Sequence, residues 1–241
     1  MRRGTIVATI IATSLVVLGG VIFGGAMSIV KWNFMKLSMS TCETNEYTVS
    51  EAYQNIKVVT CTANVILVPS DTNETEVVCR EQTQRKHTVT VQEDTLVIEV
   101  VDTLKWYQQI FNFGTTTITV YVPSSVLGDV SVKNSTGNVK MSDCTLGNLT
   151  VKNATGNVSL ENVQVTDRIA ITNSTGNVKF KDCDAASIYV KTSTGNVKGN
   201  FLTEKQFITN TSTGNIRVPE SEVGGRCEIT TSTGNIHFTI G

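Results

Sequence analysis

The side chains that most often carry out chemistry are sparse in this sequence. It has only two histidines, His87 and His237, far apart in the chain. Asp143, Asp182 and Asp184 lie in segments that connect apolar runs, and no acidic cluster recurs with the repeat described below. Glycoside-cleaving enzymes place two carboxyl groups on either side of the bond that they break. The sequence therefore predicts solvated carboxylates here, and a protein that is not an enzyme.

The cysteines are the other candidate ligands: Cys42, Cys61, Cys79, Cys144, Cys183 and Cys227. No two of them have the spacing of common zinc sites, and the repeat glycines have no acidic neighbours that could bind calcium, so we expect neither metal nor cofactor. Cys144 and Cys183 occupy the same repeat position two repeats apart, which is roughly 10 Å in a stack and too far for a disulfide. We expect most thiols to be buried as small apolar groups. Cys61 and Cys79 are the pair to examine first for a disulfide.

Basic residues follow the repeat at outward positions beside a turn. They are Lys133, Lys152 and Lys191 on one strand, and Lys140, Lys179, Lys198 and Arg217 on the other. The net charge is only −1, which argues against nucleic acid as a partner. We call these seven basic residues the predicted basic ridge. Residues 129–241 carry 11 basic and 10 acidic side chains, so this part of the chain is nearly neutral overall. Phosphate-bearing wall polymers or anionic lipid headgroups are the predicted ligands, and simple solubility is the alternative role.

A Thr-Gly-Asn tripeptide recurs six times at intervals of 19 or 20 residues. Its glycines are Gly137, Gly156, Gly176, Gly195, Gly214 and Gly234, and its asparagines are Asn138, Asn157, Asn177, Asn196, Asn215 and Asn235. A turn that needs positive φ selects glycine, and the following asparagine can bond its own backbone or line up in a ladder. We interpret the tripeptide as a structural corner.

Apolar residues alternate with polar ones on both sides of each corner. Val139, Val158 and Val178 stand two residues after their glycines, and Val132 and Val151 stand five before theirs. This period of two predicts two half-buried strands per repeat. A unit of 19 or 20 residues cannot bury a core alone, but stacked units can. The predicted fold is all-β, a β-solenoid resembling a β-helix, over residues 129–241.

The segment 38–128 is rich in predicted strands but has no regular repeat. Val58 to Val68 is predicted as one strand, and Thr62-Ala63-Asn64-Val65 resembles a decayed corner. We expect this irregular β region to cap the solenoid on its membrane side.

The N-terminus predicts one transmembrane helix. Gly4 to Val30 is uncharged, and as a helix it would span about 40 Å, more than the roughly 30 Å of a bilayer core. Trp32 suits the membrane interface. We expect a cytoplasmic tail at 1–3, an uncleaved signal anchor at 4–30, a juxtamembrane segment at 31–37 and an extracellular C-terminal domain. A cleavable signal peptide, cut after Gly24-Gly25-Ala26, is the alternative.

The last predicted strand, Ile236 to Ile240, contains no Lys, Glu or Pro, the residues that usually blunt a sheet edge. We predict that it forms the open end of the stack, with Ile236, Phe238 and Ile240 available to a protein partner or to a second copy. A frayed final half-coil is the alternative.

Several segments together resemble an adhesin family of bacterial membrane proteins, a β-strand-repeat domain of unknown function. They are Trp32-Asn33-Phe34 to Lys36-Leu37, Thr60 to Ser70, Lys105-Trp106-Tyr107, Thr119 to Pro123 and the serial Ser-Thr-Gly-Asn turns. The resemblance covers roughly residues 32–241 and implies a β-solenoid outside the membrane without established catalysis. It favours a binding or adhesion module at the cell surface, with envelope-stress sensing through a membrane partner as the alternative.

Overall fold

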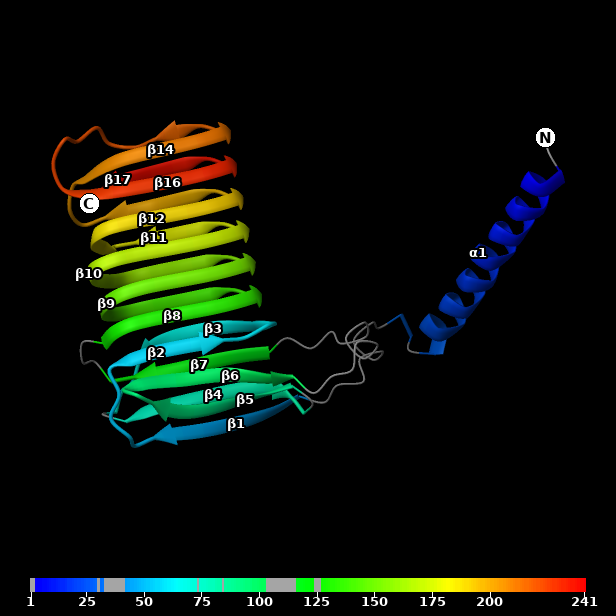
Figure 1. Ribbon diagram of the computed structural model, residues 1–241, viewed down its shortest axis with the longest axis horizontal. Helices are drawn as coiled ribbons and strands as arrows, with labels where there is room; N and C mark the ends of the chain where they lie inside the picture. The colour runs from blue at the N-terminus through cyan, green and yellow to red at the C-terminus, as the bar shows by residue number, and fades with distance from the viewer. Residues whose placement is uncertain are drawn as a thin grey trace. The chain divides into compact units, whose positions relative to one another are not determined.

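The computed structural model describes residues 3–29, 31–32, 42–72, 74–83, 85–102, 116–123 and 127–241. The N-terminal helix and the β-strands belong to two separate compact units, so each is described by itself (Figure 1). The prediction of an all-β protein with one N-terminal apolar helix is confirmed.

The helix α1 (Arg3–Ile29) has no acidic residue in its first turn and no basic residue in its last. Its segment Ile6–Ile29 is long and apolar enough to cross a membrane, although a signal sequence would meet the same criteria. Val16 is 74% exposed and Ile29 is 84% exposed. Such apolar exposure is unfavourable in water, so the composition of α1 suits a lipid environment.

The second unit contains all the described strands. They are β1 (Cys42–Val49), β2 (Asn55–Val59), β3 (Ala63–Pro69), β4 (Thr75–Gln82), β5 (Arg85–Gln92), β6 (Thr95–Asp102), β7 (Thr116–Val122), β8 (Leu127–Thr136), β9 (Val139–Thr155), β10 (Val158–Thr175), β11 (Val178–Lys181), β12 (Asp184–Thr194), β13 (Val197–Phe201), β14 (Lys205–Thr213), β15 (Ile216–Arg217), β16 (Gly225–Thr233) and β17 (Ile236–Ile240).

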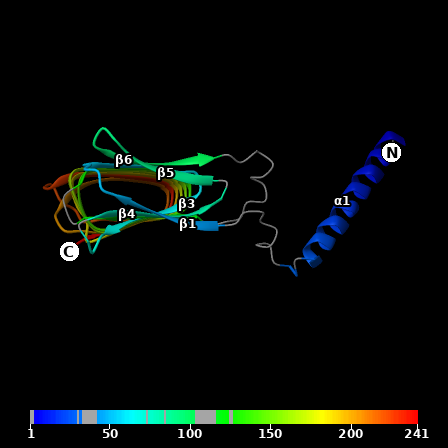
Figure 2. The same cartoon turned by 90° about the horizontal axis from the view of Figure 1, so that it is seen from below.

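The strands wind as a stack of flattened coils, as the views from the side and along the stack show (Figures 1 and 2). In each regular coil one strand leads into a Thr-Gly-Asn corner and another leaves it. The leading strands β8, β9, β10 and β12 pair in parallel and in register, so that Val132, Val151, Ile171 and Val190 form one column. Side chains of this column are at most 1% exposed, which gives the stack a continuous apolar core.

Two further coils lie within the segment expected to be an irregular cap. The predicted strand Val58 to Val68 is interrupted by a corner, because β2 ends at Val59 and β3 begins at Ala63. β2 pairs with β8, and β3 pairs with β9, both in parallel. On the other side β2 pairs with β6 and β3 pairs with β7, again in parallel. The stack therefore extends over more of the chain than the Thr-Gly-Asn repeat does.

Antiparallel strands close the stack at this end. β4 pairs with β1 and with β7, and β5 pairs with β6 along its length but meets β4 at one position. As a result the strand pairing at this end forms a closed circuit, with β1 outside it. The circuit runs through β3, β7, β4, β5, β6, β2, β8 and β9, and β9 pairs with β3 again. Neither β2 nor β3 presents a free edge, because β6 and β7 continue the stack beyond them, and β1 is the outermost strand at this end.

At the opposite end the coils are not stacked in chain order. β16 lies between β12 and β14, and β17 lies between β13 and β15. The prediction that Ile236–Ile240 forms the outermost edge is therefore wrong. Ile236 and Phe238 are buried, at 0% and 2% exposure. The outermost coil is instead the preceding repeat, with β14 at the top of the stack in Figure 1.

Aromatic packing explains why the last repeat is inserted. Gly199 occupies the position that holds Phe180 in the coil below and Phe238 in the coil above. Because Gly199 has no side chain, the rings of Phe180 and Phe238 meet across it with centroids 5.8 Å apart. Phe238 also stacks on Phe201 at 4.8 Å. The preceding repeat offers only Val218 at this position, which is too small to fill the space.

A buried ion pair crosses the inserted coil. Lys205 lies in the outermost coil and is aligned with Gly225 of the inserted coil. Nζ of Lys205 lies 2.5 Å from Oδ1 of Asp184, which belongs to the coil below the inserted one. Lys205 is 2% exposed, so an unpaired ammonium group there would be costly. A Cβ at Gly225 would lie 2.2 Å from the carbonyl oxygen of Ala186, so the aligned position beside Lys205 has to be glycine.

The corners are held by two sets of bonds. Below the outermost coil, the side-chain oxygen of each corner asparagine accepts the backbone N–H of the corner asparagine in the next coil, as in Asn157 N–H to Asn138 Oδ1 at 2.9 Å. This ladder begins at Asn64, so the decayed corner is part of the stack. Inside the corner, Asn153 donates to the carbonyl of Gly137, and Thr231 donates to that of Gly195. Asparagine and threonine therefore satisfy carbonyl groups that the corner turns inward.

All six cysteines are free, and four of them are buried as expected: Cys79, Cys144, Cys183 and Cys227. Cys61 and Cys79, the pair favoured for a disulfide, are both free thiols. Burial raises the pKa of the Cys144 thiol to about 12, and it does the same for Cys227. Such thiols remain protonated and unreactive at neutral pH.

Candidate functional site

One candidate binding surface is a column of basic side chains on the strands that leave the corners. The inserted final coil places His237 between Lys198 and Arg217, and Lys198 lies beside Lys179. Four successive coils therefore present a basic or titratable side chain, at a spacing of about 4.8 Å. We call Lys179, Lys198, His237 and Arg217 the basic column. All four side chains are exposed.

The remaining residues of the predicted basic ridge lie nearby. Lys140 continues the same column but is separated from Lys179 by Ser159. Lys133 and Lys152 are neighbours on the leading strands, and Thr172 separates Lys152 from Lys191. The residues of the predicted basic ridge on the leading strands are therefore fewer and farther apart than those of the basic column.

The basic column is free of local counter-ions. Lys57, Lys86 and Lys181 form ion pairs with glutamates, whereas no residue of the basic column is ion-paired within the described parts of the chain. Like charges in neighbouring coils repel one another, so a bound anion would relieve that repulsion. This arrangement can bind repeated phosphate or carboxylate groups.

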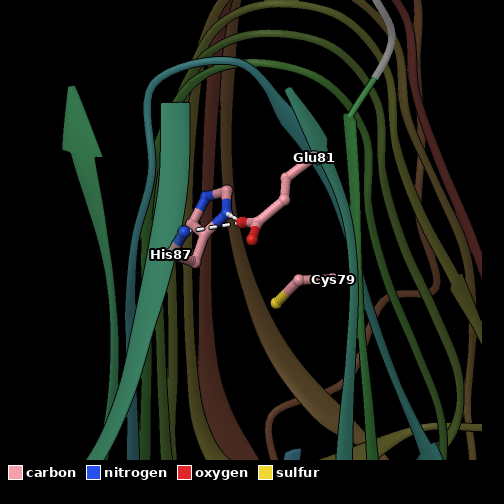
Figure 3. Close-up of side chains that lie close together, drawn as sticks. All are labelled: Cys79, Glu81 and His87. Carbon is pink, nitrogen blue, oxygen red and sulfur yellow. Dashed lines mark hydrogen bonds and ion pairs between the residues drawn. The ribbon is translucent and has the colours of Figure 1, made fainter. Parts of the chain in front are cut away.

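A second cluster lies buried at the closed end of the stack, where β4 turns into β5. Cys79 and Glu81 point inward from β4, and His87 points inward from β5 (Figure 3). Oε2 of Glu81 accepts from the backbone N–H of His87 at 2.6 Å and from its ring Nδ1 at 2.7 Å. The side chains of Glu81 and His87 are 0% and 1% exposed.

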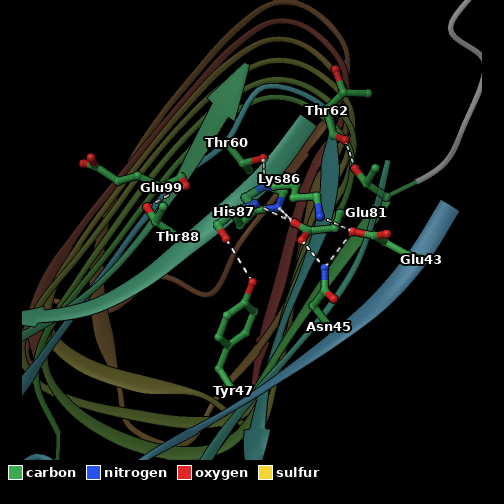
Figure 4. A network of polar contacts seen from close by, with 11 residues as sticks. Glu43, Asn45, Tyr47, Thr60, Thr62, Glu81, Lys86, His87, Thr88 and Glu99 are labelled. Carbon is green, nitrogen blue, oxygen red and sulfur yellow. Dashed lines mark hydrogen bonds and ion pairs between the residues drawn. The ribbon is translucent and has the colours of Figure 1, made fainter. Parts of the chain in front are cut away.

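Further bonds surround this pair, as Figure 4 shows. Asn45 donates to Oε1 of Glu81 at 2.7 Å, and Thr60 bonds Nε2 of His87 at 3.1 Å. The hydroxyl of Tyr47 donates to the carbonyl oxygen of His87 at 3.2 Å. These bonds join β1, the first corner, β4 and β5, so the network fastens the strands that close the stack.

Thiol, carboxylate and imidazole groups are also zinc ligands, and the three donor atoms lie within 4.8 Å of one another. Ligand atoms on one tetrahedral zinc ion would be roughly 3.3 Å apart, given bonds of about 2.0–2.3 Å. Nδ1 of His87 and Oε2 of Glu81 are closer than that and share a hydrogen bond. Burial raises the pKa of the Cys79 thiol to about 12, with a smaller contribution from the charge of Glu81. The geometry is that of a closed hydrogen-bonded network.

Glu43 and Lys86 form an exposed ion pair beside this network, with Nζ and Oε1 2.6 Å apart. The hydrogen bond to Lys86 lowers the pKa of the Glu43 carboxyl, and the same bond raises the pKa of the Lys86 amine. Both groups are solvated, so the pair contributes little to stability.

Sequence reasoning missed three features of these sites. His237 shares its repeat position with the lysines, so an alignment on the glycines could have found it. Asp143, Asp182 and Asp184 were interpreted as solvated loop charges, but Asp184 is ion-paired with the buried Lys205. Asp143 and Asp182 have positive φ, at 56° and 52°, at a second set of corners. Asparagine and aspartate tolerate this conformation better than other side chains. The pairing of Glu81 with His87 had no signal in the repeat, because it lies outside it.

Two bacterial proteins with solved structures are among those similar to this chain. A candidate cell adhesion protein from Clostridium sporogenes is 11% identical, with a TM-score of 0.52, over 83% of this chain and 100% of that one. A candidate adhesin from Bacteroides fragilis is 19% identical, with a TM-score of 0.49, over 83% of this chain and 97% of that one. At 11% identity the likeness to the Clostridium sporogenes protein concerns the fold alone.

None of the curated proteins matches the chain. A family profile, however, matches residues 53–241, which include every coil of the stack and most of its closed end. The chain therefore belongs to the Toastrack DUF4097 family.

Proposed function

We propose that this chain is a membrane-anchored, extracellular binding module of the bacterial cell surface, and that it does not catalyse a reaction. In this proposal residues 4–30 anchor the chain, residues 1–3 lie in the cytoplasm, and the β unit lies outside. Its ligands are anionic polymers of the cell wall or anionic lipid headgroups, held by the basic column.

The observation that carries the proposal is the set of unpaired cations at one repeat position on neighbouring coils. A polyanion presents charges at regular intervals, so it can contact several members of the basic column at once. The fold of the Clostridium sporogenes protein, a candidate adhesion protein, supports a binding role.

We expect Lys179→Glu with Lys198→Glu to weaken binding to a poly(glycerol phosphate) polymer by at least about 30-fold, since each surface lysine contributes about 1 kcal/mol toward an anionic surface. Binding of the unchanged protein should weaken as salt is raised, because the charges are exposed. The measurement is a titration of the full chain in detergent micelles, followed by fluorescence of labelled polymer. Vesicles with anionic lipids, used in parallel, separate the lipid source from the polymer.

The matched control is Lys57→Glu with Lys181→Glu, which changes the net charge equally at two lysines of similar exposure. We expect less than a threefold effect there, because both lysines are already neutralised by glutamates. Equal losses in the two double variants would mean that net charge alone governs binding, and would contradict a site at the basic column.

A further inference from the structure

We infer that the outermost coil is a pairing surface through which two copies of this chain join edge to edge. The end coil is defined here as residues 202–224, which include β14, β15 and the connection that follows. It is separate from the basic column except at Arg217, and this pairing does not depend on the polymer binding proposed above.

The first observation is an open strand edge. β14 is nine residues long and pairs with β16 on one side, while no described strand pairs with its other side. The carbonyl oxygen of Thr213 accepts from Gly234 in the coil below. Backbone groups alternate in direction along a strand, so those of Gln206, Ile208 and Asn210 face away from the stack. Such an edge is a template for another strand.

The second observation is where exposed apolar side chains gather. Among the described strands and connections of the β unit, five large apolar side chains are more than 40% exposed, and four of them belong to the end coil. They are Leu202 at 44%, Ile208 at 50%, Ile216 at 42% and Val223 at 60%. The edge also has no exposed charge to repel another strand, because its one charged residue, Lys205, is buried against Asp184.

The third observation is the distribution of charge, which identifies the partner. Arg217 lies close to the corner, whereas Glu204, Glu220 and Glu222 lie toward the opposite end of the coil, where the connection runs in Figure 1. When two copies of β14 pair antiparallel about a twofold axis, the basic end of each copy meets the acidic end of the other. The end coil is thus complementary in charge to a second copy of itself.

The opposite end of the stack is built differently. Its outer strands are antiparallel, and among the described strands β1 pairs only with β4. Contact of end coil with end coil places the same edge on both partners, so it closes after two copies.

The test uses the full chain in a density-matched detergent, with its mass determined by sedimentation equilibrium over a concentration series. We expect a dimer whose dissociation constant rises at least tenfold in Ile208→Lys. The matched control is Ala170→Lys, which places the same charge in the same outward column three coils below. Any association of α1 contributes equally to all variants. A monomeric unchanged protein, or equal effects of the two lysines, would overturn the inference.

A mixing experiment tests the geometry itself. Arg217→Glu alone, and Glu220→Arg with Glu222→Arg alone, should each remain monomeric because like charges meet at both ends of the pair. A mixture of the two should dimerise, since each contact then joins opposite charges. Variants that had merely misfolded would not regain pairing on mixing. Failure of the mixture to dimerise, while each variant keeps its melting temperature, would rule out the antiparallel arrangement.

Discussion

Replacing Gly176 by valine is expected to lower the stability of the β unit by about 4 kcal/mol, a large part of the roughly 5–15 kcal/mol that holds a typical domain together. Gly176 has a φ of 136°, which side chains rarely adopt. A Cβ there would lie 2.0 Å from the carbonyl oxygen of Gly156 in the coil below. Backbone strain of about 1–3 kcal/mol and overpacking of about 1–3 kcal/mol therefore act together. Chemical denaturation followed by circular dichroism measures the loss.

Ser174→Val is the matched control for this substitution. Ser174 lies two residues before Gly176 on the same corner, and its side chain is exposed, so valine there requires no contact with a backbone carbonyl. We expect a change within about 0.5 kcal/mol, as is usual for surface positions. If the two valine variants unfolded at the same denaturant concentration, the corner would not need glycine and the assigned stacking contact would be wrong.

The sequence predicts the corners, but it does not predict how closely each corner glycine approaches the coil below. The spacing of Gly137, Gly156 and Gly176 predicts corners, because the Thr-Gly-Asn tripeptide recurs at a nearly fixed interval between alternating strands. Positive φ follows from the residue type. The close approach of each glycine to the carbonyl below does not, since it depends on how tightly the coils stack. Glycine is thus required twice, once for its conformation and once for its missing side chain.

The order of the last two coils shows where a repeat stops being informative. Repeats with identical corners can stack in either order, because the asparagine ladder is the same in both. The choice is made by side chains that break the repeat, such as Gly199 opposite Phe238 and Gly225 beneath Lys205. These positions look like irregularities in an alignment. In the structure they determine which coil is outermost, and so which surface is open for pairing.

The network around Glu81 could not be predicted for a different reason. β4 and β5 are adjacent in the sequence, which suggests an ordinary hairpin, yet they pair at a single position and then diverge. The divergence turns Glu81 and His87 toward each other inside the stack. A buried carboxyl group is uncommon, and no local pattern marks it before the topology is known.

His87→Leu is expected to lower stability by about 3–5 kcal/mol, the cost of removing one partner from a buried pair. Glu81 would lose the ring donor at 2.7 Å and keep only the backbone N–H and Asn45, in a site with 0% exposure. Glu81→Leu should cost a similar amount, because the imidazole then has no acceptor at Nδ1. The double variant should cost far less than the sum, since no unpaired polar side chain of the pair remains.

His87→Asn is the matched control. The asparagine amide can still donate to Glu81, so His87→Asn should lose less than half as much stability as His87→Leu. Denaturation of all four variants in one buffer measures the coupling between Glu81 and His87. Additive losses would show that the two side chains stabilise the closed end of the stack independently, and that the bond joining β4 to β5 does not fasten it.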